Sequence, residues 1–379
     1  MAAPVRIRTT HVGSLPGPPG FDATAELSAA QLHDAVAWVV GQQRAIGLDI
    51  VNEGELTKGG DWLAFMNDRL GGFEPRVANA GSIIAAGKDR EEFADFYRWA
   101  SERQTLFFTA DRRMAVARRY LVCIAPITYT GEASLAREIA TLKELVRNPR
   151  ECFLTSTAPA SLEPYRGNEF YRDEHDFLWA LAEALRVEYE AIARAGFQLQ
   201  VDDAWLVALW DRIGIRMGLQ EFRKRCSERV AALNHALANV PEEQIRYHLC
   251  WGSWHGPHAY DIPLKDVVDI MLSVKARYYS FEAANVRHQH EHTVWQETRL
   301  PEGKVILPGV VTHSTDLIEH PQLVCERILR FASLVGPENV IASTDCGFGG
   351  RTHPQIAWAK LKALCDGAAL AGDALRAGH

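Results

Sequence analysis

The sequence predicts a single (β/α)8 barrel. Eight short apolar runs recur along the 379 residues, and each ends at a polar residue or glycine before a segment with helical periodicity. Nearly continuous apolar runs are typical of parallel strands that are buried on both faces. Eight such strands that alternate with helices can close into a barrel, although an open doubly wound sheet is the structural alternative. No repeat, linker or low-complexity stretch divides the chain, so we expect one domain over residues 1–379.

The predicted strands follow these apolar runs in chain order. They are residues 9–14, 48–55, 152–159, 197–203, 246–252, 278–285, 305–311 and 340–347. The segments between them carry helix signals. Ser28 and Gln31 form a capping-box pattern before an apolar helical stripe. A second stripe spans 178–192 and is closed by Gly196, and a third spans 324–335 and ends at Gly-Pro.

The connection after the second predicted strand is too long for one loop and one helix. Residues from about 61 to 150 therefore form an inserted excursion. Within it, RYLVCIAPITYTG at 119–131 is rich in β-branched and aromatic residues, so we expect a strand pair or ribbon near the barrel mouth.

Composition narrows the class of function. A net charge of −7 disfavours nucleic acid and anionic membranes as partners, because both require a basic face. No run of 18 apolar residues and no apolar signal segment occurs, so we expect a cytoplasmic protein that does not enter a membrane. The seven cysteines are scattered and odd in number, which argues against a disulfide framework. A small-molecule ligand fits this composition best.

The candidate site lies where the predicted strands end. In (β/α)8 barrels the reacting groups project from the carboxyl ends of the strands. The strand-ending side chains that would meet at one rim are Ser14, Glu55, Asp202, Asp203, His248, Cys250, Glu282, His313, Asp345 and Cys346.

Four of these side chains predict a metal site. His248 and Cys250 are two residues apart on one strand, so both side chains point to the same side. Together with Glu282 and Cys346 they offer N, S, O and S donors, a set that suits tetrahedral zinc. Alone, a His-x-Cys pair is more often part of a packed core. Four such donors at three strand ends favour the metal.

Two other groups have a functional and a structural interpretation. His288, His290 and His292 alternate after Glu282, and a polar loop before the next helix explains them better than a second metal site. Glu55 and Asp202 are either solvated strand-end acids or a pair that recognises a substrate ammonium group.

With these residues in view, the chain resembles the catalytic C-terminal half of cobalamin-independent methionine synthase along most of its length. The motifs that carry the resemblance are, in order, THVGS, NEGE, LQVDD, HLC, FEAANVRHQHE and TDCG. The pattern H-x-C, a later Glu and D-C-G is fairly specific to the family. The others are individually loose but agree in order and spacing. The chain is about half the length of the full enzyme, so it is similar to the stand-alone, single-barrel branch.

The resemblance implies a zinc site and an amino-acid thiol as acceptor. The zinc ligands map to His248, Cys250, Glu282 and Cys346. Ser14 would lie near the carboxylate of homocysteine, and Glu55 and Asp202 would hold its ammonium group.

The donor side matches the family less well. Tyr165 aligns with a tryptophan that faces the pterin, and Cys123 to Pro126 replace an arginine-bearing ribbon that helps to hold folate. The methyl donor therefore stays open between methyltetrahydrofolate, a methylated corrinoid and a simpler methyl compound, either free or on a donor protein.

The expected reaction is S-methylation of homocysteine to methionine. A free thiol is mostly protonated at neutral pH, and only its thiolate attacks carbon. Zn2+ removes that proton, and two thiolates and a carboxylate leave the site with a net charge of −1, which keeps the substrate sulfur electron-rich. A poorly leaving donor also needs a general acid. His313 is the first candidate for this role and Asp203 the second.

Other functions are compatible with the same barrel. One is alkylation of another thiol such as coenzyme M, although a sulfonate would call for basic residues where Glu55 and Asp202 stand. Another is a non-catalytic barrel that binds zinc or a thiol. A third is a metal-free, decarboxylase-like barrel.

Overall fold

Seven parallel strands form a curled sheet, and an eighth segment closes it into a ring. The computed structural model describes residues 6–22, 25, 27–59, 63–76, 86–106 and 120–377. The order around the sheet is β1-β10-β9-β8-β7-β6-β4. The bounds are β1 Arg8–Thr9, β4 Phe153–Thr157, β6 Gln198–Asp203, β7 Ile245–Leu249, β8 Tyr278–Phe281, β9 Val305–Val311 and β10 Ile341–Thr344.

Residues 49–52 fill the gap between β1 and β4. The Ile50 amide donates to the Thr9 carbonyl at 3.1 Å, and the Val51 amide donates to the Glu151 carbonyl at 3.0 Å. Val51 also forms a parallel bridge with Cys152. Each predicted run thus supplies one position of the ring, and the predicted (β/α)8 barrel is confirmed. The second run contributes a bridge rather than a full strand.

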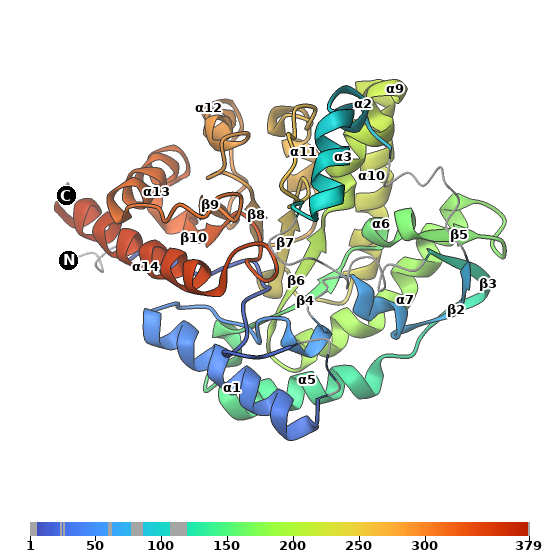
Figure 1. Cartoon of the computed structure of the whole chain (residues 1–379), viewed down its shortest axis with the longest axis horizontal. Helices are drawn as coiled ribbons and strands as arrows, with labels where there is room; N and C mark the ends of the chain where they lie inside the picture. The colour runs from blue at the N-terminus through green and yellow to red at the C-terminus, as the bar shows by residue number, and fades with distance from the viewer. Residues whose placement is uncertain are drawn as a thin grey trace.

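Helices surround this ring (Figure 1). The longer ones are α1 Ala29–Ile46, α5 Glu132–Leu145, α7 Glu174–Arg194, α10 Leu219–Ala236, α13 Pro321–Val335 and α14 Pro354–Ala377. The shorter ones are α6 Pro159–Leu162, α8 Trp205–Leu209, α9 Ile215–Met217, α11 Val268–Leu272 and α12 Val294–Glu297. Ser28 and Gln31 form the predicted capping box of α1. None of the helices in the described residues combines the length and apolar content needed to cross a lipid bilayer.

The excursion builds a small second sheet and a helical pair. β2 Leu70–Arg76 pairs antiparallel with β3 Tyr120–Tyr129, and β3 pairs parallel with β5 Arg166–Asn168. The described part of the predicted segment 119–131 thus contributes one long strand rather than a strand pair, and its partners come from distant segments. The helical pair is α2 Lys88–Glu92 and α3 Ala94–Arg103, and α2 lies beside α9, where Arg216 pairs with Glu91 (Figure 1).

One part of the buried core comes from the barrel strands. Ile50, Phe153, Val305, Leu307 and Ile341 form a separate apolar cluster. Nearby, the buried Arg246 guanidinium lies 3.8 Å from the centre of the Phe153 ring and donates to the His11 carbonyl at 2.8 Å. These residues lie toward the beginnings of the strands, so the polar side chains at the carboxyl ends are left to line a site.

Candidate metal centre and substrate cavity

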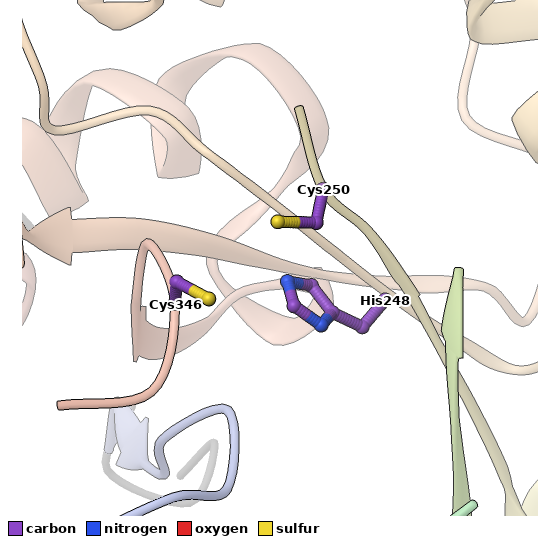
Figure 2. Close-up of side chains that lie close together, drawn as sticks. All are labelled: His248, Cys250 and Cys346. Carbon is purple, nitrogen blue, oxygen red and sulfur yellow. The ribbon is translucent and has the colours of Figure 1, made fainter. Parts of the chain in front are cut away.

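Three predicted ligands meet at the carboxyl ends of the barrel strands. His248 is on β7, Cys250 directly follows β7, and Cys346 follows β10. One ligand atom from each of the three lies within 4.8 Å of the other two, and all three side chains are buried. Figure 2 shows the imidazole and the two sulfur atoms pointing toward a common centre. The alternation of strand side chains explains why His248 and Cys250 share one side.

The His248 ring is oriented by its neighbour on β6. The parallel register places Asp202 opposite His248, and Asp202 Oδ1 lies 2.8 Å from His248 Nδ1. The other nitrogen, Nε2, is buried and has no hydrogen-bond partner among the described residues. A histidine that gives one nitrogen to a carboxylate and leaves the other free has the usual arrangement of a metal ligand. The donor set therefore fits zinc.

Glu282 stands beside this cluster. Its Oε1 lies 3.7 Å from Cys250 Sγ and also accepts the Trp251 amide at 3.0 Å. Its Oε2 accepts from Asn285 Nδ2 at 2.7 Å. Burial raises the pKa of Glu282 to about 7. The carboxylate is thus adjacent to the thiols, but it does not belong to the group whose atoms lie within 4.8 Å of one another.

The two thiols have opposite tendencies to lose a proton. A hydrogen bond from Cys250 holds the pKa of Cys346 well below its usual range, and the positive charges of Arg351 and His248 act in the same direction. The same hydrogen bond, together with burial, raises the pKa of Cys250. The pair can therefore provide one thiolate, which is the form that binds a metal.

A cavity opens directly beside the cluster. Its lining includes Val12, Ser14, Glu55, Arg90, Leu106, Asp202, Ala204, Trp205, Ala208, Arg212, His248, Cys250, Gly252, Ser253, Trp254, Cys346, Gly347 and Arg351. Three predicted substrate-binding residues, Ser14, Glu55 and Asp202, thus face the same cavity as the three clustered ligands. The structure brings together side chains that are far apart in the sequence.

Glu55 is held in an unusual conformation. Its backbone φ is +59°, in the left-handed region. A Cβ at Gly13, whose φ is +148°, would lie 2.3 Å from Glu55 Oε1. Burial raises the pKa of Glu55 to about 8, and the nearby charge of Asp202 adds to this effect. An ammonium group between the two acids would relieve their repulsion.

Besides Glu282, three predicted residues do not line this cavity, namely Tyr165, Asp203 and His313. Tyr165 is buried and packs edge-on against Trp205, a lining residue, with 5.8 Å between ring centroids. Asp203 accepts hydrogen bonds from Ser161 Oγ at 2.8 Å and Tyr247 OH at 3.0 Å. Asp203 follows Asp202 on β6, so the two side chains point to opposite sides of the strand.

His313 is buried and is not part of the cavity lining. Burial and the positive charge of Arg351 hold its pKa well below the usual value. Its Nδ1 has no hydrogen-bond partner among the described residues. His313 is therefore neutral at pH 7 and would need a change in its surroundings to donate a proton.

The basic and aromatic part of the lining was not predicted from the sequence. Arg351 donates to Ser253 Oγ and, at 3.2 Å, to the Gly349 carbonyl. Its position five residues after Cys346 was a signal that could have been used. Arg90 and Arg212 gave no such signal, because one lies in the excursion and the other beyond α8.

The histidine-rich loop forms a structural network. His288 Nδ1 lies 2.9 Å from Glu291 Oε2, and its Nε2 lies 3.3 Å from Asp261 Oδ2. These hydrogen bonds overcome the effect of burial and raise the pKa of His288 to about 10. Throughout the described ranges, the cluster of His248, Cys250 and Cys346 is the only group of at least three such side chains with metal-binding geometry. This agrees with the polar-loop interpretation.

Comparison of the sequence with known proteins finds full-length similarity at low identity. No family model matches the chain. YxjH of Bacillus subtilis, described as an uncharacterized protein, is 24% identical, and the alignment covers 95% of this chain and 93% of YxjH. A methionine synthase of Saccharolobus solfataricus is 22% identical over 97% of this chain and 96% of its own.

Solved structures show the same fold over almost the whole chain. A B12-independent methionine synthase from Shewanella sp. W3-18-1, in complex with selenomethionine, has a TM-score of 0.71 and 18% identity, with 98% of this chain and 99% of that chain covered. A putative vitamin-B12 independent methionine synthase from Listeria monocytogenes has a TM-score of 0.65 and 17% identity, with 96% and 98% covered. The chain therefore has the fold of a stand-alone barrel of this kind, and the resemblance found in its motifs is confirmed.

Proposed function

We propose that the protein is a zinc-dependent S-methyltransferase that converts homocysteine to methionine. The observation that carries the proposal is the unpartnered, buried His248 Nε2 beside the sulfur atoms of Cys250 and Cys346. The acids at the cavity wall support an acceptor with an amino group. The relatives and solved structures named methionine synthase support the reaction type.

His248, Cys250 and Cys346 would hold the metal, and Glu282 is the proposed fourth ligand. Zinc at this position would bind the substrate sulfur as a thiolate and keep it nucleophilic at neutral pH. Glu282 contacts Cys250 but is also hydrogen-bonded to Trp251 and Asn285. If the Glu282 carboxylate left the metal and stayed hydrogen-bonded to Trp251 and Asn285, a coordination position would be free for the incoming thiol.

The side chains around the metal position the acceptor. Asp202 fixes the ring of His248 through Nδ1. Glu55 and Asp202 would pair with the ammonium group of homocysteine, and Ser14 would lie near its carboxylate. An arriving ammonium group would lower the raised pKa of Glu55, so binding and ionisation of this acid would be coupled.

Donor protonation is the less defined step. His313 is the proposed general acid, and its neutral imidazole would first have to gain a proton through a change in its surroundings, for which the unpartnered Nδ1 is available. Asp203 is the second choice, since burial raises its pKa to about 6 but Ser161 and Tyr247 already occupy its oxygens. Tyr165 would act on the donor side through its contact with Trp205.

The experiment that tests the proposal combines metal analysis with a transfer assay. Purified protein should contain about one zinc per chain. With homocysteine and labelled methyltetrahydrofolate, methylcobalamin or a small methyl donor, it should form methionine. Cys250→Ser and Cys346→Ser should lose both the zinc and the transfer, whereas Cys325→Ser, a buried thiol away from the site, should keep both.

Other outcomes would assign other functions. Transfer to coenzyme M in preference to homocysteine would support a different thiol acceptor. Bound zinc whose protein ligands are not exchanged when homocysteine is added would support a non-catalytic binding protein. A zinc-free protein that still methylates homocysteine would contradict the proposal.

A further inference from the structure

The cavity carries charges of both signs on different elements. The acids Glu55 and Asp202 lie at strand ends, next to the candidate ligands. Arg90 lies on α2 of the excursion, and Arg212 lies in the π-helical turn Trp210–Gly214 after α8. Apolar and aromatic side chains form most of the remaining wall, among them Leu106, Trp205, Ala208 and Trp254.

The two arginines have few partners for their charge. Only 2% of the Arg212 side chain is exposed, and its Nη1 contacts Asp211 while its Nε has no partner within the described residues. The Nε of Arg90 is also buried and unpaired there, and the described chain supplies Arg90 with no ion pair. Its guanidinium lies 4.3 Å from the centre of the Tyr97 ring.

Burial lowers the pKa of Arg212, and the nearby charge of Arg90 lowers it further. Arg212 is buried and Arg90 is half-buried, and each has a buried Nε with no hydrogen-bond partner among the described residues. Two neighbouring guanidinium groups of this kind form an unfavourable pair unless an anion lies between them. An arginine fork is well suited to a carboxylate or a phosphate, because its planar donors match the spacing of the oxygens.

The excursion holds this arrangement in place. Asp89 on α2 accepts from Tyr97 OH at 2.6 Å and from the Ala259 amide at 2.9 Å, and its own amide donates to Asp211 Oδ1 at 2.9 Å. At Gly87, where φ is +131°, a Cβ would lie 2.3 Å from Asp211 Oδ2. Such close packing keeps both guanidinium groups at the cavity without a bound ligand.

We propose that Arg90 and Arg212 form a subsite for an anionic group on the methyl donor. This inference rests on the proposed function and narrows it to donors with an apolar or aromatic body and a carboxylate or phosphate. The acids, the candidate ligands and Ser14 account for the amino, thiol and carboxylate groups of the acceptor. The arginines and the aromatic wall are then left for the second substrate.

Two available donors share this chemistry and differ in the anion. Methyltetrahydrofolate carries carboxylates, and methylcobalamin carries a phosphate. The test is calorimetric titration of each compound into the zinc-loaded protein, without turnover, in wild type, Arg90→Met and Arg212→Met. Arg98→Met is the control, since Arg98 lies on α3 with 66% of its side chain exposed and does not line the cavity. Homocysteine is titrated into every variant in parallel.

We expect at least one of the two donors to bind wild type, and the affinity to fall about tenfold or more in each arginine variant because a charge-assisted contact is lost. Arg98→Met should leave the donor affinity unchanged. Added NaCl should weaken donor binding more in wild type than in the Arg90→Met and Arg212→Met variants. Homocysteine affinity should be the same in all variants. Arg90→Met breaks no ion pair in the described chain, so it tests the subsite even if Arg212→Met does not fold.

Three results would overturn the subsite. They are no binding of either donor to wild type, equal donor affinity in all variants, and a parallel loss of homocysteine affinity, which would assign the arginines to the acceptor carboxylate. Failure of the proposed function has a separate signature, because wild type would then bind no homocysteine.

Discussion

A single carboxylate at Asp202 illustrates how a neighbour can change the role of a residue. Its position at a strand end suggested an ammonium partner, and it does line the cavity. The register between β6 and β7 also places it opposite His248, where Oδ1 lies 2.8 Å from Nδ1. Asp202 would then serve the metal ligand as well as the substrate, and the two roles can be separated by experiment.

We expect Asp202→Asn to lower zinc affinity by about tenfold to a hundredfold, because the carboxylate that orients and polarises His248 is lost. Competition with a coloured chelator measures this change. Asp203→Asn is the matched control, since the adjacent side chain bonds Ser161 and Tyr247 on the other side of β6. Equal zinc affinity in wild type and Asp202→Asn would show that the contact does not support the metal.

Glu55 offers a residue-level test of the acceptor. Glu55→Gln should lower the affinity for homocysteine by about tenfold and lower the affinity for a thiol without an amino group much less. The reason is that only the ammonium group needs the negative charge of Glu55. Titration of both thiols into zinc-loaded protein measures the difference. A similar loss for both compounds would argue against recognition of an amino group at Glu55.

At the scale of elements, the excursion contributes to the site as well as extending the chain. Asp89 fixes α2 against Ala259 and Tyr97, and Trp254 Nε1 donates to Tyr97 OH at 3.1 Å. Together with the hydrogen bond from the Asp89 amide to Asp211, these contacts join α2 and α3 to the segments that follow β6 and β7. An inserted segment that is docked in this way can bring Arg90 to the cavity with defined geometry.

Asp89→Asn should loosen this docking, because its buried carboxylate holds a phenol and an amide at once. We expect amide hydrogen exchange in residues 88–103 to rise at least tenfold, while exchange in the barrel strands stays the same. Asp95→Asn on the exposed side of α3 is the control, since 95% of the Asp95 side chain is accessible. Unchanged exchange in Asp89→Asn would show that other contacts are sufficient.

At the scale of the whole molecule, closure of the barrel buries ionisable groups that affect stability. His11, next to β1, is only 1% exposed, and its Nε2 lies 2.8 Å from Gln43 Oε1. Burial lowers the pKa of His11 to about 3, and the nearby Arg246 acts in the same direction. The folded protein therefore keeps this imidazole neutral in acid that would protonate it in the unfolded chain.

The sign of the resulting pH dependence follows from these two pKa values. Below pH 6.5, His11 binds a proton in the unfolded chain but stays neutral in the native state. The free energy of unfolding therefore falls as the pH decreases. His11 should contribute a loss of about 1–2 kcal/mol in the free energy of unfolding between pH 6.5 and pH 5. Urea unfolding of His11→Gln should show a correspondingly smaller decrease. His33→Gln, on the outer helix α1, should follow wild type, and a His11→Gln curve parallel to wild type would contradict the prediction.

The barrel and the nature of its site were determined by the sequence. The apolar runs, the helix signals and the His-x-Cys spacing depend on local periodicity, which is fixed by neighbouring residues. For that reason the eight ring positions and the three clustered donors could be predicted, as could the acids near them.

Only the tertiary structure decided which distant groups meet. The pairing of Asp202 with His248 depends on the register between two strands, and the place of Arg90 depends on how the excursion docks. It also showed Glu282 hydrogen-bonded beside Cys250, with Asp203 and His313 outside the cavity lining. These relations arise from packing between segments that are remote along the chain, and no local pattern in the sequence encodes them.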